Sequence, residues 1–176
     1  MNEGHLPKRV THNDTKLDNV LFDQITNEAI CVVDYDTIMS GSMLFDFGDG
    51  IRSSNSNSED SLDTSKVAFN IDAYKHFTEG FLGEVAPMIT DTEKEYLHMG
   101  AIVITFEQTI RFLTDFLLGD VYFKIDYAEH NKLRARNQFK LLEGMLTKKD
   151  EMSLIVKNFN YMYVYLVIFI LCLKLT

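Results

Sequence analysis

The residues best suited to chemistry lie in two polar stretches near the start of the chain. The first stretch holds His12, Asp14, Lys16, Asp18 and Asn19 within eight positions. The second follows an apolar run and begins at Asp34. Phosphoryl transfer from a nucleotide needs a carboxylate that accepts the proton of the attacking hydroxyl, and Mg²⁺ to bridge the phosphates. Mg²⁺ keeps several waters, so one carboxylate and one amide oxygen are a normal protein contribution. We predict Asp14 as the base, and Asn19 and Asp34 as metal ligands.

Short strands must bring these residues together. Three are expected, at 9–11, 20–22 and 29–33, from their apolar and β-branched content. The turn-rich segment 23–27 joins the last two into a hairpin. Because the polar loop and Asp34 lie at the same end of that hairpin, we expect Asp14, Asn19 and Asp34 to lie close together.

The remainder of the chain predicts a helical body. Segment 38–42 is expected to be a loop, and a helical turn is expected near Ile51. Thr90 and Glu93 have the spacing of a capping box, which predicts the start of a helix there. Gly119 is expected to end that helix. Two apolar stripes have helical spacing: Ile102, Phe106, Ile110, Leu113 and Leu117, then Ala135, Phe139, Leu142 and Leu146. The fold class is therefore α+β, mainly helical, with a small β-hairpin that carries the loop.

Composition limits the class of protein. The chain has 176 residues, 46% of them apolar and 24% charged, which predicts one globular domain. A net charge of −9 without a basic patch argues against nucleic acid as a partner. Cys31 and Cys172 lie far apart in apolar runs, so both are expected to be buried thiols in a reducing cytoplasm. Segment 1–9 has no apolar core of the kind found in a secretory leader.

The C-terminal segment departs from that pattern. Residues 161–173 are thirteen consecutive apolar residues without a charge. As a helix this run would span about 20 Å, less than the roughly 30 Å of a bilayer core. We therefore divide the chain into a domain at 1–156 and an apolar tail at 157–176. The tail is interpreted as a buried element, a non-native extension, or a segment that associates with a membrane through 159–173.

The polar loop also resembles a known family. His12, Asp14 and Asn19 match the H-x-D-x-x-x-x-N loop of the aminoglycoside phosphotransferase and choline kinase superfamily, which has a protein-kinase-like fold. Five segments resemble the bacterial N-acetylhexosamine kinase branch more closely: 9–16, 33–37, 45–49, 105–115 and 119–124. The resemblance runs from about residue 9 to about residue 156. It implies Asp14 as catalytic base, Asn19 and Asp34 as metal ligands, and ATP and Mg²⁺ as cofactors.

The same resemblance implies supporting roles for other residues. His12 would hold the loop by hydrogen bonding near Asp34, and Lys16 would neutralise charge on the transferred phosphoryl group. Asp36 would be an acid behind the metal ligands. Two residues would contact the sugar or its new phosphate: Arg111 and Tyr122. The competing interpretations are a surface charge for Lys16, a salt bridge from Arg111 to an acid such as Asp115, and a core position for Tyr122.

Asp46, Phe47 and Gly48 spell the metal-binding tripeptide of protein kinases. Asp46 follows Asp14 by thirty-two residues, whereas Asp34 follows it by twenty, which the hairpin accounts for. We therefore assign the metal to Asp34. Asp46 and Asp49 are expected to cap backbone amides at a helix start instead of contacting substrate.

Enzymes of this superfamily also need a Gly-rich loop and a strand lysine to hold the nucleotide. No G-x-G-x-x-G segment occurs in these residues, so we expect the C-terminal lobe of a phosphotransferase, weakly active or inactive alone. The preferred acceptor is an N-acetylhexosamine-like sugar. An aminoglycoside, choline or homoserine remains open as acceptor. The alternative is an inactive remnant or binding protein, associated with a membrane through the tail.

Overall fold

The computed structural model describes residues 6–55, 61, 63–85 and 87–159. Its strands form two antiparallel pairs. The bounds are Arg9–Thr11 for β1, Val20–Phe22 for β2, Ala29–Val32 for β3 and Met39–Gly41 for β4. The predicted hairpin is confirmed as the β2–β3 pair, but the predicted loop at 38–42 is wrong, because β4 pairs with β1. A three-residue strand that contains a glycine gives almost no periodic signal, so the sequence could not predict β4.

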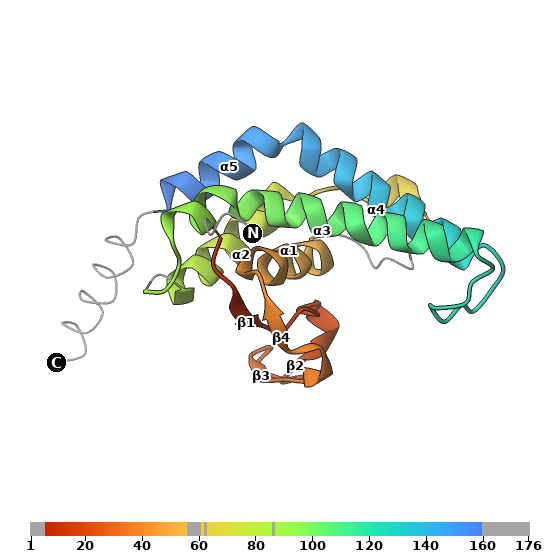
Figure 1. Cartoon of the computed structure of the whole chain (residues 1–176), viewed down its shortest axis with the longest axis horizontal. Coiled ribbons are helices and arrows are strands. Elements are labelled where there is room, and N and C mark those ends of the chain that lie inside the picture. The colour runs from red at the N-terminus through yellow and green to blue at the C-terminus, as the bar shows by residue number, and fades with distance from the viewer. Residues whose placement is uncertain (1–5, 56–60, 62, 86, 160–176) are drawn as a thin grey trace.

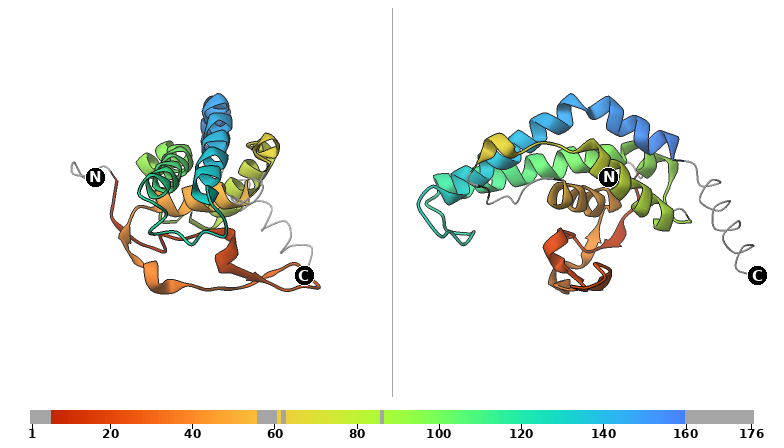
Figure 2. Two further views of the ribbon diagram at one scale, coloured as in Figure 1. Left: turned by 90° about the vertical axis from the view of Figure 1, so that its right-hand side faces the viewer. Right: turned by 180° about the vertical axis from the view of Figure 1, so that it is seen from behind.

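Five α-helices form the rest of the described chain. Their bounds are Met43–Ser54 for α1, Ile71–Val85 for α2, Asp91–Leu117 for α3, His130–Thr147 for α4 and Lys149–Asn158 for α5. Short 3-10 turns lie at Leu17–Asn19, Tyr35–Thr37 and Thr64–Lys66. α3 crosses the molecule, α4 returns beside it in the opposite direction, and the strands lie together below the helical layer (Figure 1). The end-on view in Figure 2 separates the helical layer from the strand region.

The ends of the helices follow from local chemistry. Ser42 accepts a hydrogen bond from the amide of Leu44 at the start of α1. The predicted capping box of α3 is confirmed, since Thr90 and Glu93 bond each other's backbone amides. Gly119 follows the helix with φ +93°, a conformation that glycine adopts without strain. The expected helical turn near Ile51 is in fact part of the twelve-residue helix α1.

The core is centred on α1, which packs against α3. Phe47 is fully buried, and its ring packs edge-on against Tyr74, Phe77 and Phe81. The two helices approach so closely that a Cβ at Gly100 would overlap the carbonyl oxygen of Leu44. This packing fixes α1, and with it the loop that contacts α1.

Several sequence-based expectations differ from the structure. Of the stripe on α3, only Ile102 is buried, whereas the other four members are exposed: Phe106, Ile110, Leu113 and Leu117. In α4, Ala135 and Leu142 are buried, but Phe139 and Leu146 are exposed. Cys31 is exposed, so the prediction of a buried thiol is wrong there. It lies on a two-stranded sheet whose four β3 residues are all exposed.

The predicted domain boundary cannot be placed on this structure. Helix α5 runs to Asn158, and the segment 160–176 lies outside the described residues, together with Cys172 and most of the predicted membrane-associated run. No helix within the described part of the chain is long and apolar enough to cross a membrane. The role of the tail therefore stays a prediction.

Candidate functional site

The polar loop between β1 and β2 holds the Asp14 carboxylate in a fixed position. Lys16 Nζ lies 2.9 Å from Asp14 Oδ2, and Asn19 Nδ2 donates to the same oxygen at 2.9 Å. Asn19 also donates to the backbone carbonyl of Asp14 at 2.9 Å. Both side-chain contacts use Oδ2, and no hydrogen bond to Oδ1 is present among the described residues. Asp14 Oδ1 is therefore without a hydrogen-bond partner among the described residues.

Asp46 of α1 holds the loop through its backbone. Its two carboxylate oxygens accept from the amides of His12 and Asn13, each at 2.8 Å. Thr15 Oγ1 donates to the Asp46 carbonyl at 2.6 Å. The prediction that Asp46 caps backbone amides is right, but the amides belong to the loop and not to a helix start. Ser42 caps α1 instead, because it directly precedes the helix, whereas Asp46 lies within the first turn.

Asp49 also differs from the prediction. It forms an ion pair with Arg52, with Arg52 Nη2 at 2.8 Å from Asp49 Oδ1. Its other oxygen, Oδ2, is buried and has no hydrogen-bond partner in the described segments. Arg52 Nη1 also donates to Gln138 Oε1 of α4 at 3.4 Å. The sequence did not identify this pair, although the i,i+3 spacing of an acid and a base on an apolar helix was a signal for it.

The hairpin brings Asp34 to the loop as predicted. The amide of Val33 donates to the Asn19 carbonyl at 2.9 Å, which joins the end of β3 to the loop. Asp34 follows with φ +67°, in the left-handed region. A side-chain hydrogen bond with Asp36, together with the Asp36 charge, raises the pKa of Asp34, and the same bond lowers the pKa of Asp36. The charge of Asp14 raises the pKa of Asp34 further, and the charge of Lys16 lowers it.

These oxygen donors fit Mg²⁺. The Asn19 amide nitrogen is used by Asp14, which leaves its oxygen as the amide donor. The hydrogen bond with Asp36 and the charges of Asp36 and Asp14 raise the pKa of Asp34, and a nearby cation would offset those negative charges. No three His, Cys, Asp or Glu side chains within the described chain form a metal-binding group, so a metal here would rest on one carboxylate, one amide and water.

The Lys16 side chain lies among acidic groups, whereas the His12 side chain does not make the hydrogen bond that was expected of it. Burial alone would lower the pKa of Lys16, but the hydrogen bond to Asp14 and the charges of Asp14, Asp34 and Asp49 raise it. Lys16 is thus a cation held among acids, not an isolated surface charge. The expected hydrogen bond from the His12 side chain is not formed within the described part of the chain, where both imidazole nitrogens are buried without a partner. The ring lies 5.7 Å from that of Tyr35, and the loop is held by the His12 backbone instead.

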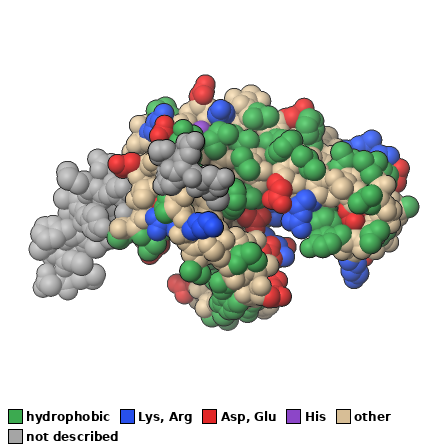
Figure 3. Space-filling view, viewed as in Figure 1, with side chains coloured by type: hydrophobic (Ala, Val, Ile, Leu, Met, Phe, Trp, Pro, Cys, Tyr) green, Lys and Arg blue, Asp and Glu red, His purple; other side chains and the backbone are tan. Residues whose placement is uncertain are grey.

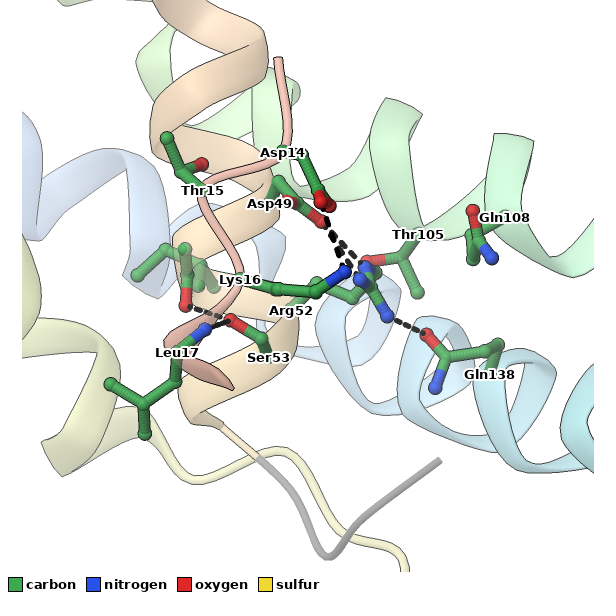
Figure 4. A network of polar contacts seen from close by, with 12 residues as sticks. Asp14, Thr15, Lys16, Leu17, Asp49, Arg52, Ser53, Thr105, Gln108 and Gln138 are labelled. Carbon is green, nitrogen blue, oxygen red and sulfur yellow. Dashed lines mark hydrogen bonds and ion pairs between the residues drawn. The ribbon is translucent and has the colours of Figure 1, made fainter. Parts of the chain in front are cut away.

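A cavity of about 770 Å³ opens beside Asp14 and Lys16. Much of its lining comes from α1, α3 and the segment after α3, including Asp49, Arg52, Glu107, Gln108, Arg111 and Tyr122. Figure 4 shows Lys16 reaching toward Asp14 beside the Asp49–Arg52 pair, with Gln138 beyond Arg52. The cavity therefore joins the predicted base to both predicted acceptor contacts, although these lie about a hundred residues later in the chain.

The alternative of a salt bridge for Arg111 is confirmed, although its partner is Glu107 and not Asp115, whereas the alternative of a core position for Tyr122 is wrong. Arg111 lies 3.9 Å from Glu107 and bonds Gln108 at 3.4 Å, but it forms no ion pair with Asp115. Tyr122 is 74% exposed and so is not part of the core. The Arg111 guanidinium lies 5.7 Å from the Tyr122 ring centre.

Asp115 is buried and shapes the segment that carries Tyr122. Its carboxylate accepts from three successive backbone amides, those of Val121, Tyr122 and Phe123, at 2.8 to 3.0 Å. Asn131 of α4 donates to it as well, at 2.9 Å. Burial would raise the pKa of Asp115, but the three amide hydrogen bonds lower it. Asp115 therefore stays ionised and folds residues 121–123 against the end of α3.

Comparison with protein families bears on the first half of the chain. Residues 2–79 match the model of the phosphotransferase enzyme family, APH. The matched region contains the polar loop, the hairpin and α1, and it indicates a phosphotransferase. It supports the resemblance to the aminoglycoside phosphotransferase superfamily, but it does not single out the N-acetylhexosamine branch. Arg111 and Tyr122 lie outside the match, and the roles of all the site residues remain predictions.

Proposed function

We propose that this chain supplies the acceptor-activating and metal-binding part of an ATP-dependent phosphotransferase that acts on a sugar hydroxyl. The observation that carries the proposal is the position of Asp14. Its carboxylate is held by Lys16 and Asn19, and it lines a cavity large enough for a small acceptor. A base must lie within hydrogen-bond reach of the hydroxyl that it deprotonates, and this cavity permits that.

The lining of the cavity favours a neutral, polyhydroxylated acceptor. Three acids and three bases line it, namely Asp14, Asp49, Glu107, Lys16, Arg52 and Arg111. A polycationic aminoglycoside or a quaternary ammonium would favour a surplus of acids or an aromatic cage. Balanced charges with Gln108 and the Tyr122 ring suit hydroxyl and acetamido groups. An N-acetylhexosamine is therefore the preferred acceptor.

In the proposed reaction, Asp14 accepts the proton of the acceptor hydroxyl while the acceptor oxygen attacks the γ-phosphorus of ATP. Lys16 stabilises the negative charge of the phosphoryl group as it is transferred, and ADP leaves. Asn19 and Asp34 would hold Mg²⁺, which would offset the negative charge of the phosphates.

Acceptor binding can be tested on the chain itself by calorimetry. We expect saturable binding of N-acetylglucosamine, weakened roughly tenfold by Arg111→Ala and by Tyr122→Ala, since each removes about 1.4 kcal/mol of contact. Tyr96→Ala is the control, because Tyr96 is exposed on α3 and does not line the cavity. Preferred binding of kanamycin, choline or homoserine in the same titration would assign a different acceptor.

Catalysis is tested by transfer of the radiolabelled γ-phosphate of ATP to the sugar over long incubations. Asp14→Asn should lower the rate by at least ~10²-fold, because a general base contributes about 10²–10⁴. The Asp14→Asn substitution should have only a small effect on the affinity for ATP. Asp18→Asn, at an exposed loop position, is the matched control. Unchanged transfer by Asp14→Asn would rule out Asp14 as the base. Rapid turnover by the 176 residues alone would show that no further nucleotide-holding segment is needed.

A further inference from the structure

A second hollow lies between α3 and α4, away from the Asp14 cavity. Its volume is about 500 Å³, within the range of roughly 300–1,000 Å³ that small-ligand sites occupy. None of its lining residues lines the Asp14 cavity. Leu113 faces this hollow, whereas Arg111, two residues earlier, faces the other cavity. Since residues two apart point to nearly opposite sides of a helix, α3 separates the two sites.

The floor of this hollow, which we call the α3–α4 groove, is apolar. Leu113 and Phe116 of α3 face Ala135 and Phe139 of α4 across it. Leu113 is 44% exposed and Phe139 is 52% exposed, so much of this apolar surface meets solvent. Burying it against a hydrocarbon body would contribute about 25 cal/mol for each Å² removed from water.

The rim of the groove is cationic. Lys132, Arg136 and Lys140 follow one another at four-residue spacing on α4, and all three line the groove. No acidic side chain is among the residues described as lining it. Lys132 and Lys140 have acid neighbours on their own helix, at 2.6 Å from Glu129 and 3.1 Å from Glu143. A basic ridge is unusual on a chain whose net charge is −9, and it selects for an anionic occupant.

We propose that the α3–α4 groove binds a small amphipathic anion, with a hydrocarbon body on the Leu113–Phe139 floor and an anionic head at Arg136. A protein partner fits less well, since stable protein interfaces bury at least ~1,000 Å² and this surface is a single hollow. The chemical class is that of a medium-chain monocarboxylate. This site is independent of the proposed phosphotransfer, because the two cavities share no lining residue.

The test is calorimetric titration of the full chain with dodecanoate below its micelle concentration. We expect one saturable site. Arg136→Glu and Phe139→Ala should each weaken binding tenfold or more, about 1.4 kcal/mol, through the lost charge pair or the lost apolar contact. Both side chains are exposed, so the variants should fold, which circular dichroism checks. Lys75→Glu is the control, because it makes the same change in net charge at an exposed position of α2.

Two further measurements decide the class of occupant. Dodecyltrimethylammonium has the same chain with a cationic head and should bind at least tenfold more weakly than dodecanoate. The Leu113 methyl resonances should shift with saturation by dodecanoate. The proposal is overturned by an absence of saturable binding, by equal effects of Lys75→Glu and Arg136→Glu, or by equal binding of the two amphiphiles. Self-association of the chain that Phe139→Ala abolishes would also overturn it, because the groove would then be an interface between copies.

Discussion

Asp46, Phe47 and Gly48 each have a structural role that the metal-binding tripeptide of protein kinases would not suggest. Asp46 binds the amides of His12 and Asn13, and Phe47 is fully buried among aromatic rings. A Cβ at Gly48 would overlap the carbonyl of Gly100. Both Asp46 oxygens are occupied by the loop, so this carboxylate is poorly placed to bind a metal. The tripeptide alone could not distinguish a metal-binding role from these structural roles. The separation from Asp14, twenty residues for Asp34 and thirty-two for Asp46, was the reason to prefer Asp34.

Asp46→Asn should destabilise the protein by about 2 kcal/mol. An amide group offers one acceptor oxygen, so one of the two loop amides, at His12 or Asn13, would face an NH₂ group. A hydrogen bond to a charged group contributes about 1.5–3 kcal/mol. Urea unfolding monitored by circular dichroism measures the change. Asp18→Asn should stay within about 0.5 kcal/mol of the parent, because Asp18 is exposed. Equal stability of the two variants would mean that Asp46 does not hold the loop.

At the scale of whole elements, the crossing of α1 and α3 leaves no room for side chains between the backbones. Gly100→Ala should cost about 2–3 kcal/mol in the free energy of unfolding, because its Cβ would meet the Leu44 carbonyl, which is backbone and cannot turn aside. Gly80→Ala is the matched control within a helix, because no atom lies within 4 Å of a Cβ built there. We expect Gly80→Ala to be neutral or to stabilise by up to ~1 kcal/mol. A neutral Gly100→Ala would show that the helices can separate at little cost.

Helix α3 also shows why periodicity alone misplaced a buried face. The predicted stripe follows the large apolar residues, but α1 and α4 pack on a face that includes small and polar ones. Ala101, Thr105 and Thr109 are buried, and each threonine hydroxyl bonds a carbonyl one turn earlier. A hydroxyl satisfied within its own helix can be buried at little cost. Large residues such as Phe106 and Ile110 were left exposed as a result.

At the scale of the whole molecule, Arg9 joins the first strand to the start of α3. Arg9 Nε lies 2.6 Å from Glu93 Oε1, and Glu93 is 1% exposed. Burial alone would raise the pKa of Glu93, but the hydrogen bonds from Arg9 and Thr90 hold it below its ordinary value of 4.5. A carboxyl group with a lowered pKa in the folded state stabilises the fold above its unfolded pKa. That stability is lost as the pH falls through the lowered value.

Glu93→Gln should therefore lower the stability at pH 7 by about 2 kcal/mol and flatten its dependence on pH below about 4.5. Urea unfolding at a series of pH values from 3 to 7 measures both effects. Glu95→Gln, on the same helix but exposed, should keep the parent profile. If the free energy of unfolding of Glu93→Gln fell with decreasing pH as steeply as that of the parent, other carboxyl groups would dominate the response to acid.

The sequence predicted the parts of this molecule that depend on local signals. The hairpin, the capping box and the approach of Asp34 to the Asp14 loop all follow from strand, turn and cap residues close together in the chain. The cavity could not be predicted in this way, because Arg52 and Gln108 reach it only through the packing of α1 against α3. The sequence likewise could not predict that the His12 imidazole is buried without a hydrogen-bond partner among the described residues, because burial depends on residues from other segments.

Asp115 holds the segment that follows α3 by its backbone alone. The three amides that it binds belong to Val121, Tyr122 and Phe123, and none of these side chains takes part in the hold. Any residue except proline can offer the same amide. A substitution at position 122 would therefore keep these three hydrogen bonds, so the side chain there can change while the path of the chain is kept. If Tyr122 contacts the acceptor as proposed, a substitution there would change acceptor preference and leave the loop around Asp14 intact.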